Sequence, residues 1–143
     1  MAYCILADIK KALSEEIIKQ LTDDDNIGEI ISANVTKAIA RADAEIDGYC
    51  GANGRYKVPF TTVPPVVAGL SLDISIYYLY KRRTVPDNVK DSYDYAVARL
   101  KDISSGKMSL GIDPPPAAST SEGAESNKSV SDRIFTRDTM KGF

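Results

Sequence analysis

The chain has 143 residues, 43% of them hydrophobic, and a formal net charge of −2. That length suits one domain with an appended segment, and the hydrophobic content is sufficient for a core. A mildly acidic chain argues against a dedicated nucleic-acid binder, which usually carries a basic face or stripe. The absence of histidine excludes His-based catalytic triads and the commonest metal ligand.

The remaining chemistry points to neither a catalytic site, a cofactor nor a metal, so we expect a protein that is not an enzyme. Consecutive acidic residues such as Asp23, Asp24 and Asp25 more often cap a helix than bind a metal. Cys4 and Cys50 are the two cysteines, and no signal peptide opens the sequence MAYCILADIKKAL. We therefore expect two reduced, buried thiols in a cytoplasmic setting.

Three helices are predicted in the first 50 residues. Asp8 is expected to cap a short helix that runs through Leu13, and Ser14 a second one that ends at residue 22. Apolar residues at steps of three and four then predict a longer, alanine-rich helix over residues 27–49. The glycine-containing segment that follows, residues 51–65, is a loop of about 15 residues, a length that is more often functional than filler.

The next helix is the most apolar segment of the chain and is predicted to be the central helix. It follows Pro64 and Pro65 and spans residues 66–80. Because it is apolar nearly all round, we expect other helices to surround it. Asp73 near its middle is expected to bond a buried partner, such as Arg55, Lys57 or a tyrosine hydroxyl. The polar flanks and Asp73 argue against a membrane span.

A last helix is predicted over residues 88–104, antiparallel to the central one and capped by Asp87, with Gly106 ending it. Residues 107–132 are rich in proline and serine and predict a flexible linker. Apolar residues return in residues 133–143, which we interpret as a docking segment. The predicted fold is therefore all-α: a compact four- to five-helix bundle over residues 1–106, with a long inter-helix loop and an extended C-terminal arm.

Several segments resemble one known family. They are the opening MAYCILADIKKALSEEIIKQLTDD, the helix end AEIDGYCGANGRYKVPF, the segment TTVPPVVAGLSLDISIYYLYKRR and the terminal IFTRDTMKGF. Together they resemble the small head–tail connector, or head completion, proteins of Mu-like prophages and other long-tailed bacteriophages. Two departures from the family pattern are the residues 51–54 before Arg55 and a serine at position 75 in place of alanine.

The resemblance implies a helical adaptor in the neck of the virion, assembled in the cytoplasm of a host bacterium. Such proteins form a homo-oligomeric ring, usually of twelve copies, beneath the portal protein. The ring extends the DNA channel, so its contact with DNA is passive, and it presents a surface to a tail-terminator or stopper protein. No membrane partner is implied.

In a ring, the contacts between neighbouring subunits are heterologous, so each subunit needs two different complementary surfaces. For the subunit or portal interface, the resemblance points to the middle loop and the C-terminal segment. The candidate residues are Arg55, Tyr56, Lys57, Val58, Pro59, Phe60, Arg133, Ile134, Phe135, Thr136, Arg137, Met140 and Phe143. A channel through which DNA slides should not grip phosphates. On that ground the candidate channel-facing residues are Asp23, Asp24, Asp25 and Glu29.

Two alternatives stay open. A tail-terminator or tail-completion ring protein would need the same kind of contact surfaces. A small DNA-binding regulator would use the basic run Lys81, Arg82 and Arg83 on phosphates, and its binding would weaken steeply with salt.

Overall fold

The computed structural model describes residues 2–112, and within them the fold is all-α, as predicted. A single turn of 3-10 helix, η1, covers Ala52–Gly54. The five α-helices are α1 (Leu6–Ala12), α2 (Glu15–Thr22), α3 (Ser32–Cys50), α4 (Pro65–Tyr80) and α5 (Asp87–Ser105).

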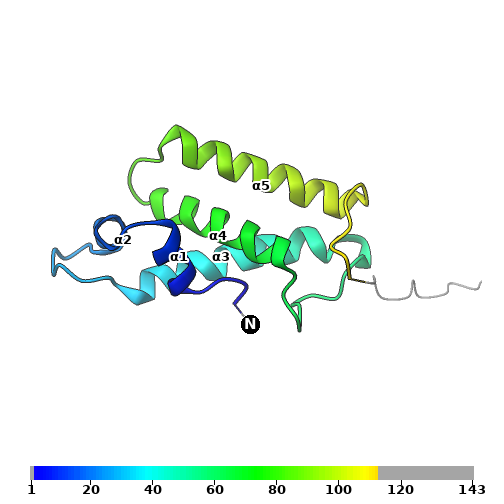
Figure 1. Ribbon diagram of the computed structural model, residues 1–143, viewed down its shortest axis with the longest axis horizontal. Helices are drawn as coiled ribbons and strands as arrows, with labels where there is room; N and C mark the ends of the chain where they lie inside the picture. The colour runs from blue at the N-terminus through cyan, green and yellow to red at the C-terminus, as the bar shows by residue number, and fades with distance from the viewer. Residues whose placement is uncertain (1, 113–143) are drawn as a thin grey trace, which may run out of the picture.

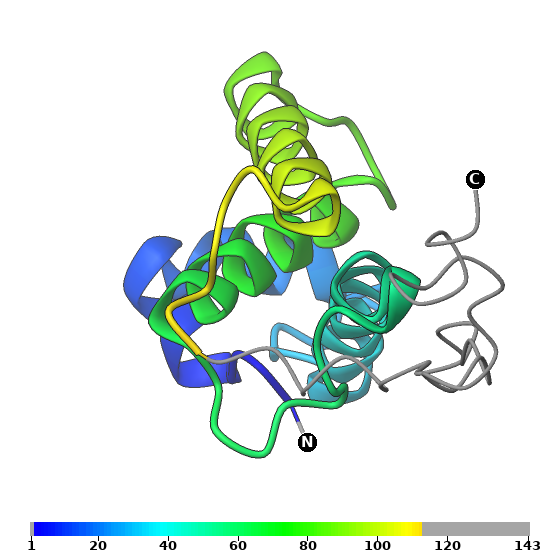
Figure 2. The same ribbon diagram turned by 90° about the vertical axis from the view of Figure 1, so that its right-hand side faces the viewer.

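Helix α4 occupies the centre of the bundle, as expected from its composition. It contacts each of the other four α-helices, and α3 and α5 pack along it most closely. Figure 1 shows α5 running antiparallel to α4 after a short connection. In the end-on view of Figure 2, α1 and α2 lie on one side of α4 and α3 lies on the other.

The few polar side chains of α4 that are buried find partners inside the bundle. Ser71 donates a hydrogen bond to Asp43 Oδ1 on α3, at 2.8 Å between the oxygens. The Ser75 hydroxyl lies 3.5 Å from the Cys4 sulfur. Because a buried hydroxyl without a partner costs free energy, these two contacts are what allow α4 to sit in the middle of a core.

The loop between α3 and α4 is part of the core rather than a projection from it. Tyr56 and Phe60 are each only 3% exposed. The Phe60 N–H donates to the Tyr3 hydroxyl at 3.1 Å. The Leu110 N–H donates to the Tyr56 hydroxyl at 3.2 Å. Since Leu110 is itself buried, the packed body extends beyond residue 106, the boundary expected from composition.

Helix α3 begins five residues later than its apolar periodicity predicts. The Asp23 carboxylate accepts hydrogen bonds from the N–H groups of Ile27 and Gly28, at 3.0 and 2.7 Å. Gly28 has φ +81° and Asn26 has φ +55°, both incompatible with a continuing helix. This local hydrogen bonding turns the segment into a loop and leaves Ile27 62% exposed.

Two predicted caps are also displaced by one turn or less. Ile5, not Asp8, is the N-cap residue of α1, and the Asp8 carboxylate reaches back to accept from the Ile5 N–H at 3.2 Å. Pro86 is the N-cap residue of α5, so Asp87 lies in its first turn. The acidic side chains still favour these helix N-termini, through the helix dipole.

Both cysteines are unpaired and buried, as expected. Burial, together with the negative charge of Asp47, raises the pKa of the Cys50 thiol to about 11. No helix within residues 2–112 is long and apolar enough to cross a membrane.

Gly106 ends α5 in a conformation that suits glycine alone. Its φ is +85°, and a Cβ atom there would lie 2.6 Å from Arg55 Nη1. We expect Gly106→Ala to lower the free energy of unfolding by about 1–2 kcal/mol, because alanine is strained at positive φ and the guanidinium must move. As a control, Gly48→Ala lies inside α3 with open space around the added carbon. It should stabilise the chain by up to about 1 kcal/mol. Urea denaturation measures both, and equal effects would contradict the interpretation.

Tyr56 gives a second prediction, because its ring and its hydroxyl contribute separately. Tyr56→Phe leaves the buried Leu110 N–H without an acceptor and should cost about 1–3 kcal/mol. Tyr56→Ala also removes a buried ring and should cost about 3–5 kcal/mol. Lys57→Ala, at the exposed neighbour, should change stability by less than about 0.5 kcal/mol. A Tyr56→Ala variant as stable as the wild type would show that the loop does not belong to the core.

Candidate interaction surfaces

The six loop residues expected at an interface do not share one environment. Lys57 and Pro59 are exposed, and Arg55 and Val58 are half-buried. Tyr56 and Phe60 are buried against the chain's own residues, with tilted aromatic contacts between Phe60 and both Tyr3 and Tyr56. Within one copy of the chain these two side chains belong to the core, and their contact with a partner stays a prediction.

Arg55 is held by its own subunit. Its guanidinium packs against Gly106 and lies 5.8 Å from the centre of the Tyr56 ring. Its Nε is buried and has no hydrogen-bond partner among the described residues. Of the predicted loop surface, Lys57 and Pro59 are the side chains fully open to a partner.

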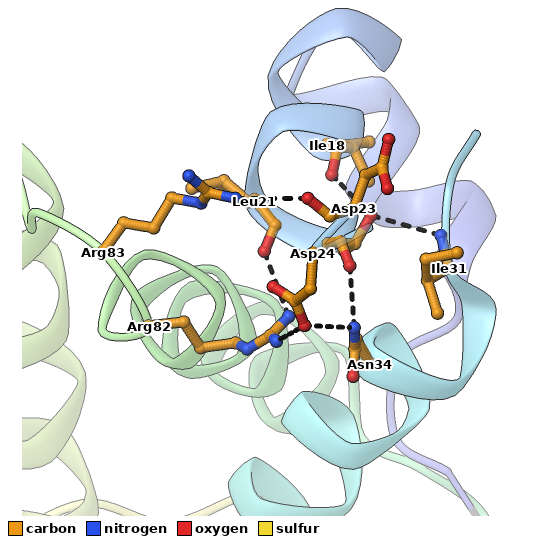
Figure 3. A network of polar contacts seen from close by, with 9 residues as sticks. Ile18, Leu21, Asp23, Asp24, Ile31, Asn34, Arg82 and Arg83 are labelled. Carbon is orange, nitrogen blue, oxygen red and sulfur yellow. Dashed lines mark hydrogen bonds and ion pairs between the residues drawn. The ribbon is translucent and has the colours of Figure 1, made fainter. Parts of the chain in front are cut away.

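The acidic segment after α2 is tied to the C-terminal end of α4 by two arginines, as Figure 3 shows. Arg82 forms an ion pair with Asp24 and donates from Nη1 to the Leu21 carbonyl oxygen at 3.2 Å. Arg83 donates from Nη2 to the Asp23 carbonyl oxygen at 3.2 Å. The basic run at the end of α4 therefore neutralises the last carbonyls of a neighbouring helix and fixes the loop that follows it.

The same segment is fastened to α3 on its other side. Asn34 donates from Nδ2 to the Thr22 carbonyl oxygen at 2.7 Å, and its amide also reaches Asp24. The Thr22 hydroxyl donates to the Ile18 carbonyl oxygen at 2.7 Å and accepts from the Ile31 N–H at 3.3 Å. These contacts join α2, α3 and α4 at one end of the bundle.

The four candidate channel residues are divided by this network. Asp23 is 8% exposed, and the N–H groups of Gly28 and Ile27 lower the pKa of its carboxyl. Its side chain therefore caps the loop, and its position in a channel stays a prediction. Asp24 is exposed but paired with Arg82. Asp25 and Glu29 are exposed and form no ion pair within residues 2–112.

A hollow of about 550 Å³ lies beside this loop, between α2 and the end of α4. Lys19 and Arg83 line it together with Glu16 and Asp23, so its charges are mixed. No group of three or more side chains suited to holding a metal ion occurs within residues 2–112.

Helix α3 directs three carboxylates into the bundle, which its pattern of polar residues did not indicate. Glu45 accepts from the hydroxyls of Tyr78 and Tyr93, at 2.9 and 3.0 Å. Burial and the bond to Glu45 raise the pKa of Tyr78. Asp43 accepts from the Tyr3 N–H at 3.1 Å, and Asp47 accepts from the Tyr3 hydroxyl. These carboxylates therefore hold elements of the bundle together.

One side of α4 is left partly uncovered, although the helix is apolar nearly all round. The residues on this side are named the α4 stripe: Val66, Gly69, Asp73 and Ile76. Val66 is 39% exposed. Two hollows adjoin the stripe, one of about 400 Å³ towards α1 and one of about 160 Å³ towards α5.

Asp73 departs from the sequence-based expectation. Burial alone raises the pKa of its carboxyl, and none of the ion pairs among residues 2–112 includes it. Arg55 and Lys57, the partners expected for it, lie elsewhere: Arg55 packs against Gly106 and Lys57 is exposed. The sequence signal that does locate the stripe is the lack of any polar face on α4.

The predicted C-terminal contact residues, within residues 133–143, lie outside the described part of the chain. The linker predicted over residues 107–132 is described only as far as residue 112. Their proposed role therefore depends on the sequence.

Comparison with known proteins identifies the family. A sequence model of the family described as Bacteriophage Mu, Gp36 matches residues 3–128. The chain is also 29% identical, over 133 residues, to the Mu-like prophage FluMu protein gp36 of Haemophilus influenzae. That similarity covers 93% of this chain and 92% of the relative. With most of its length matched, the chain belongs to the Bacteriophage Mu Gp36 family.

Proposed function

We propose that this chain is a head–tail connector that assembles as a ring beneath the portal of a filled capsid and joins the capsid to the tail. The observation that carries the proposal is the match to a Mu phage family over residues 3–128. That range contains the helix ends and the loop whose residues resemble connector proteins.

The body has the properties of a protein that works through contacts. Large apolar side chains are exposed at separate places, with Ile5 56%, Ile27 62% and Tyr95 56% exposed. The carboxylates that could have served chemistry, such as Asp43 and Glu45, are occupied by hydrogen bonds within the bundle. We propose a structural rather than an enzymatic role because these carboxylates are already engaged within the fold.

In the proposed ring the C-terminal segment, residues 133–143, reaches the portal or a neighbouring copy. It contains apolar residues such as Ile134, Phe135 and Phe143 beside basic ones. Asp25 and Glu29 remain the candidates for the channel wall, because an acidic wall does not hold phosphates. The expected location is the neck of the virion, with twelve copies as the expected ring size.

A DNA-binding regulator is less well supported. Two of the three residues in the basic run, Arg82 and Arg83, are engaged with the segment after α2. A tail-completion ring would use the same surfaces as a connector. The two functions are therefore distinguished by which incomplete particles accumulate when the protein is missing.

Loss of the protein gives the direct test. When the gene is deleted from the phage that carries it, DNA-filled heads and finished tails should accumulate separately in electron micrographs, because the joining surface is absent. Supplying the intact chain in trans should restore joined particles. Tails of irregular length would instead indicate a tail-terminating protein, and normal particles would contradict both roles.

The C-terminal segment gives a second test. A chain lacking residues 134–143 should keep the far-UV circular dichroism and melting temperature of the full chain, because the described core ends before this segment. It should nevertheless fail to join heads to tails. A matched control replaces Thr139 by serine, which keeps every candidate contact residue of the segment, and should join normally. Heads that acquire tails without residues 134–143 would show that this segment does not dock.

A further inference from the structure

The uncovered side of α4 raises the question of what covers it. The buried side of the helix carries Val67, Leu70, Ile74 and Leu79. The α4 stripe lies on the other side and is flanked by the two hollows towards α1 and α5. Because these side chains are mostly apolar, leaving them in water forgoes stabilisation that an added surface would supply.

The charge of Asp73 limits which surfaces could cover the α4 stripe. Asp73 is half-buried and lines a hollow together with the apolar Leu13, Ile76 and Val89 and the polar Asn88 and Ser92. Taking a carboxylate partly out of water without a partner costs free energy, and the raised pKa of Asp73 reflects that cost. An apolar surface with a cation at the matching position would cover the stripe and remove the cost.

The same chain presents such a surface. Its α3 outer face consists of Lys37, Ala40, Arg41 and Ala44, all exposed. Neither cation forms an ion pair with a described residue, and the Arg41 guanidinium lies 4.5 Å from the centre of the Tyr78 ring. Hollows of about 440 and 410 Å³ lie on either side of Ala40. Small residues between them allow another helix to approach closely.

The two surfaces lie on different sides of the molecule. Tyr78 lines the hollow that also contains Lys37 and Arg41. It follows Asp73 by five residues, which on an α-helix is a rotation of about 140°. In Figure 2, α3 accordingly lies on the side of α4 away from α1. Two unlike surfaces placed in this way are what a head-to-tail contact between identical subunits requires.

We propose that the α4 stripe of one copy packs against the α3 outer face of the next copy, with Asp73 paired with the Lys37 and Arg41 cations of that copy. The inference rests on the proposed connector function, because it supplies the contact that repeats around the ring. Charge complementarity within one chain favours a second copy over the portal as the occupant of the stripe.

Asp73→Asn gives the first test, because it keeps the shape of the side chain and removes its charge. The isolated chain should melt at an equal or higher temperature, since an unpaired charge is gone. Self-association, followed by sedimentation velocity with and without purified portal protein, should weaken at least tenfold. Asp91→Asn, at an exposed position on α5, is the matched control and should assemble as the wild type does.

A charge exchange gives the second test. Asp73→Lys alone and the double variant Lys37→Glu/Arg41→Glu alone should each fail to self-associate. An equimolar mixture should form mixed oligomers, because each variant offers the surface that the other needs. Native mass spectrometry would detect the alternating species. A contact that pairs like surfaces would instead leave one variant, the one whose contacting surface is unchanged, able to self-associate alone.

The outcomes separate this inference from the connector role. Normal self-association of Asp73→Asn, or no rescue on mixing two folded variants, overturns the interface and leaves the connector function standing. If Asp73→Lys does not fold, Asp73→Asn is combined with Lys37→Glu/Arg41→Glu. Because these residues would belong to one contact, the loss of self-association in the combined variant should be smaller than the sum of the two separate losses. Loss of portal binding with unchanged self-association would assign the stripe to the portal and overturn the inference. Normal particles after gene deletion would remove the connector function itself.

Discussion

The constraint on which the structure depends is that α4 has almost no polar side to turn towards water. Every other element is placed by the need to cover it. Helix α3 approaches closely because its inner face contains alanines such as Ala38 and Ala42, which are buried. Helix α5 returns antiparallel along α4, and the loop between α3 and α4 adds Phe60 to the same core. Polar atoms inside this arrangement are tolerated where they have partners, as Ser71 and Ser75 do.

Several charged residues within residues 2–112 fasten elements together. Glu45 joins α3 to α4 and α5 through two tyrosine hydroxyls. Arg82 and Arg83 join the end of α4 to the segment after α2. The sequence pattern does not indicate these contacts, because each of them joins residues that lie far apart in the chain.

The sequence predicted the helices well where a local signal decided the outcome. Pro65 and Gly106 fix the start of α4 and the end of α5. The prediction failed where a competing interaction lay outside the pattern. Ile27 and Ile30 continue the helical spacing of α3. The Asp23 carboxylate, however, accepts hydrogen bonds from the N–H groups of Ile27 and Gly28 and holds this segment as a loop. The burial of Tyr56 could not be foreseen, because Leu110, the residue whose N–H it accepts, is 54 positions away. That Asp73 forms no ion pair within residues 2–112 depends likewise on tertiary packing.

Asp73 also bears on how a ring protein avoids unwanted association. An exposed apolar stripe without a charge would adhere to many surfaces, including other copies in the wrong register. A half-buried carboxylate makes each of those contacts unfavourable, because covering it without a cation removes its remaining water. Only a surface that places a cation opposite Asp73 escapes this cost. The charge therefore contributes little to the stability of the isolated chain. In the proposed ring it selects the register in which neighbouring copies meet, a role for which a buried polar group is better suited than a purely apolar one.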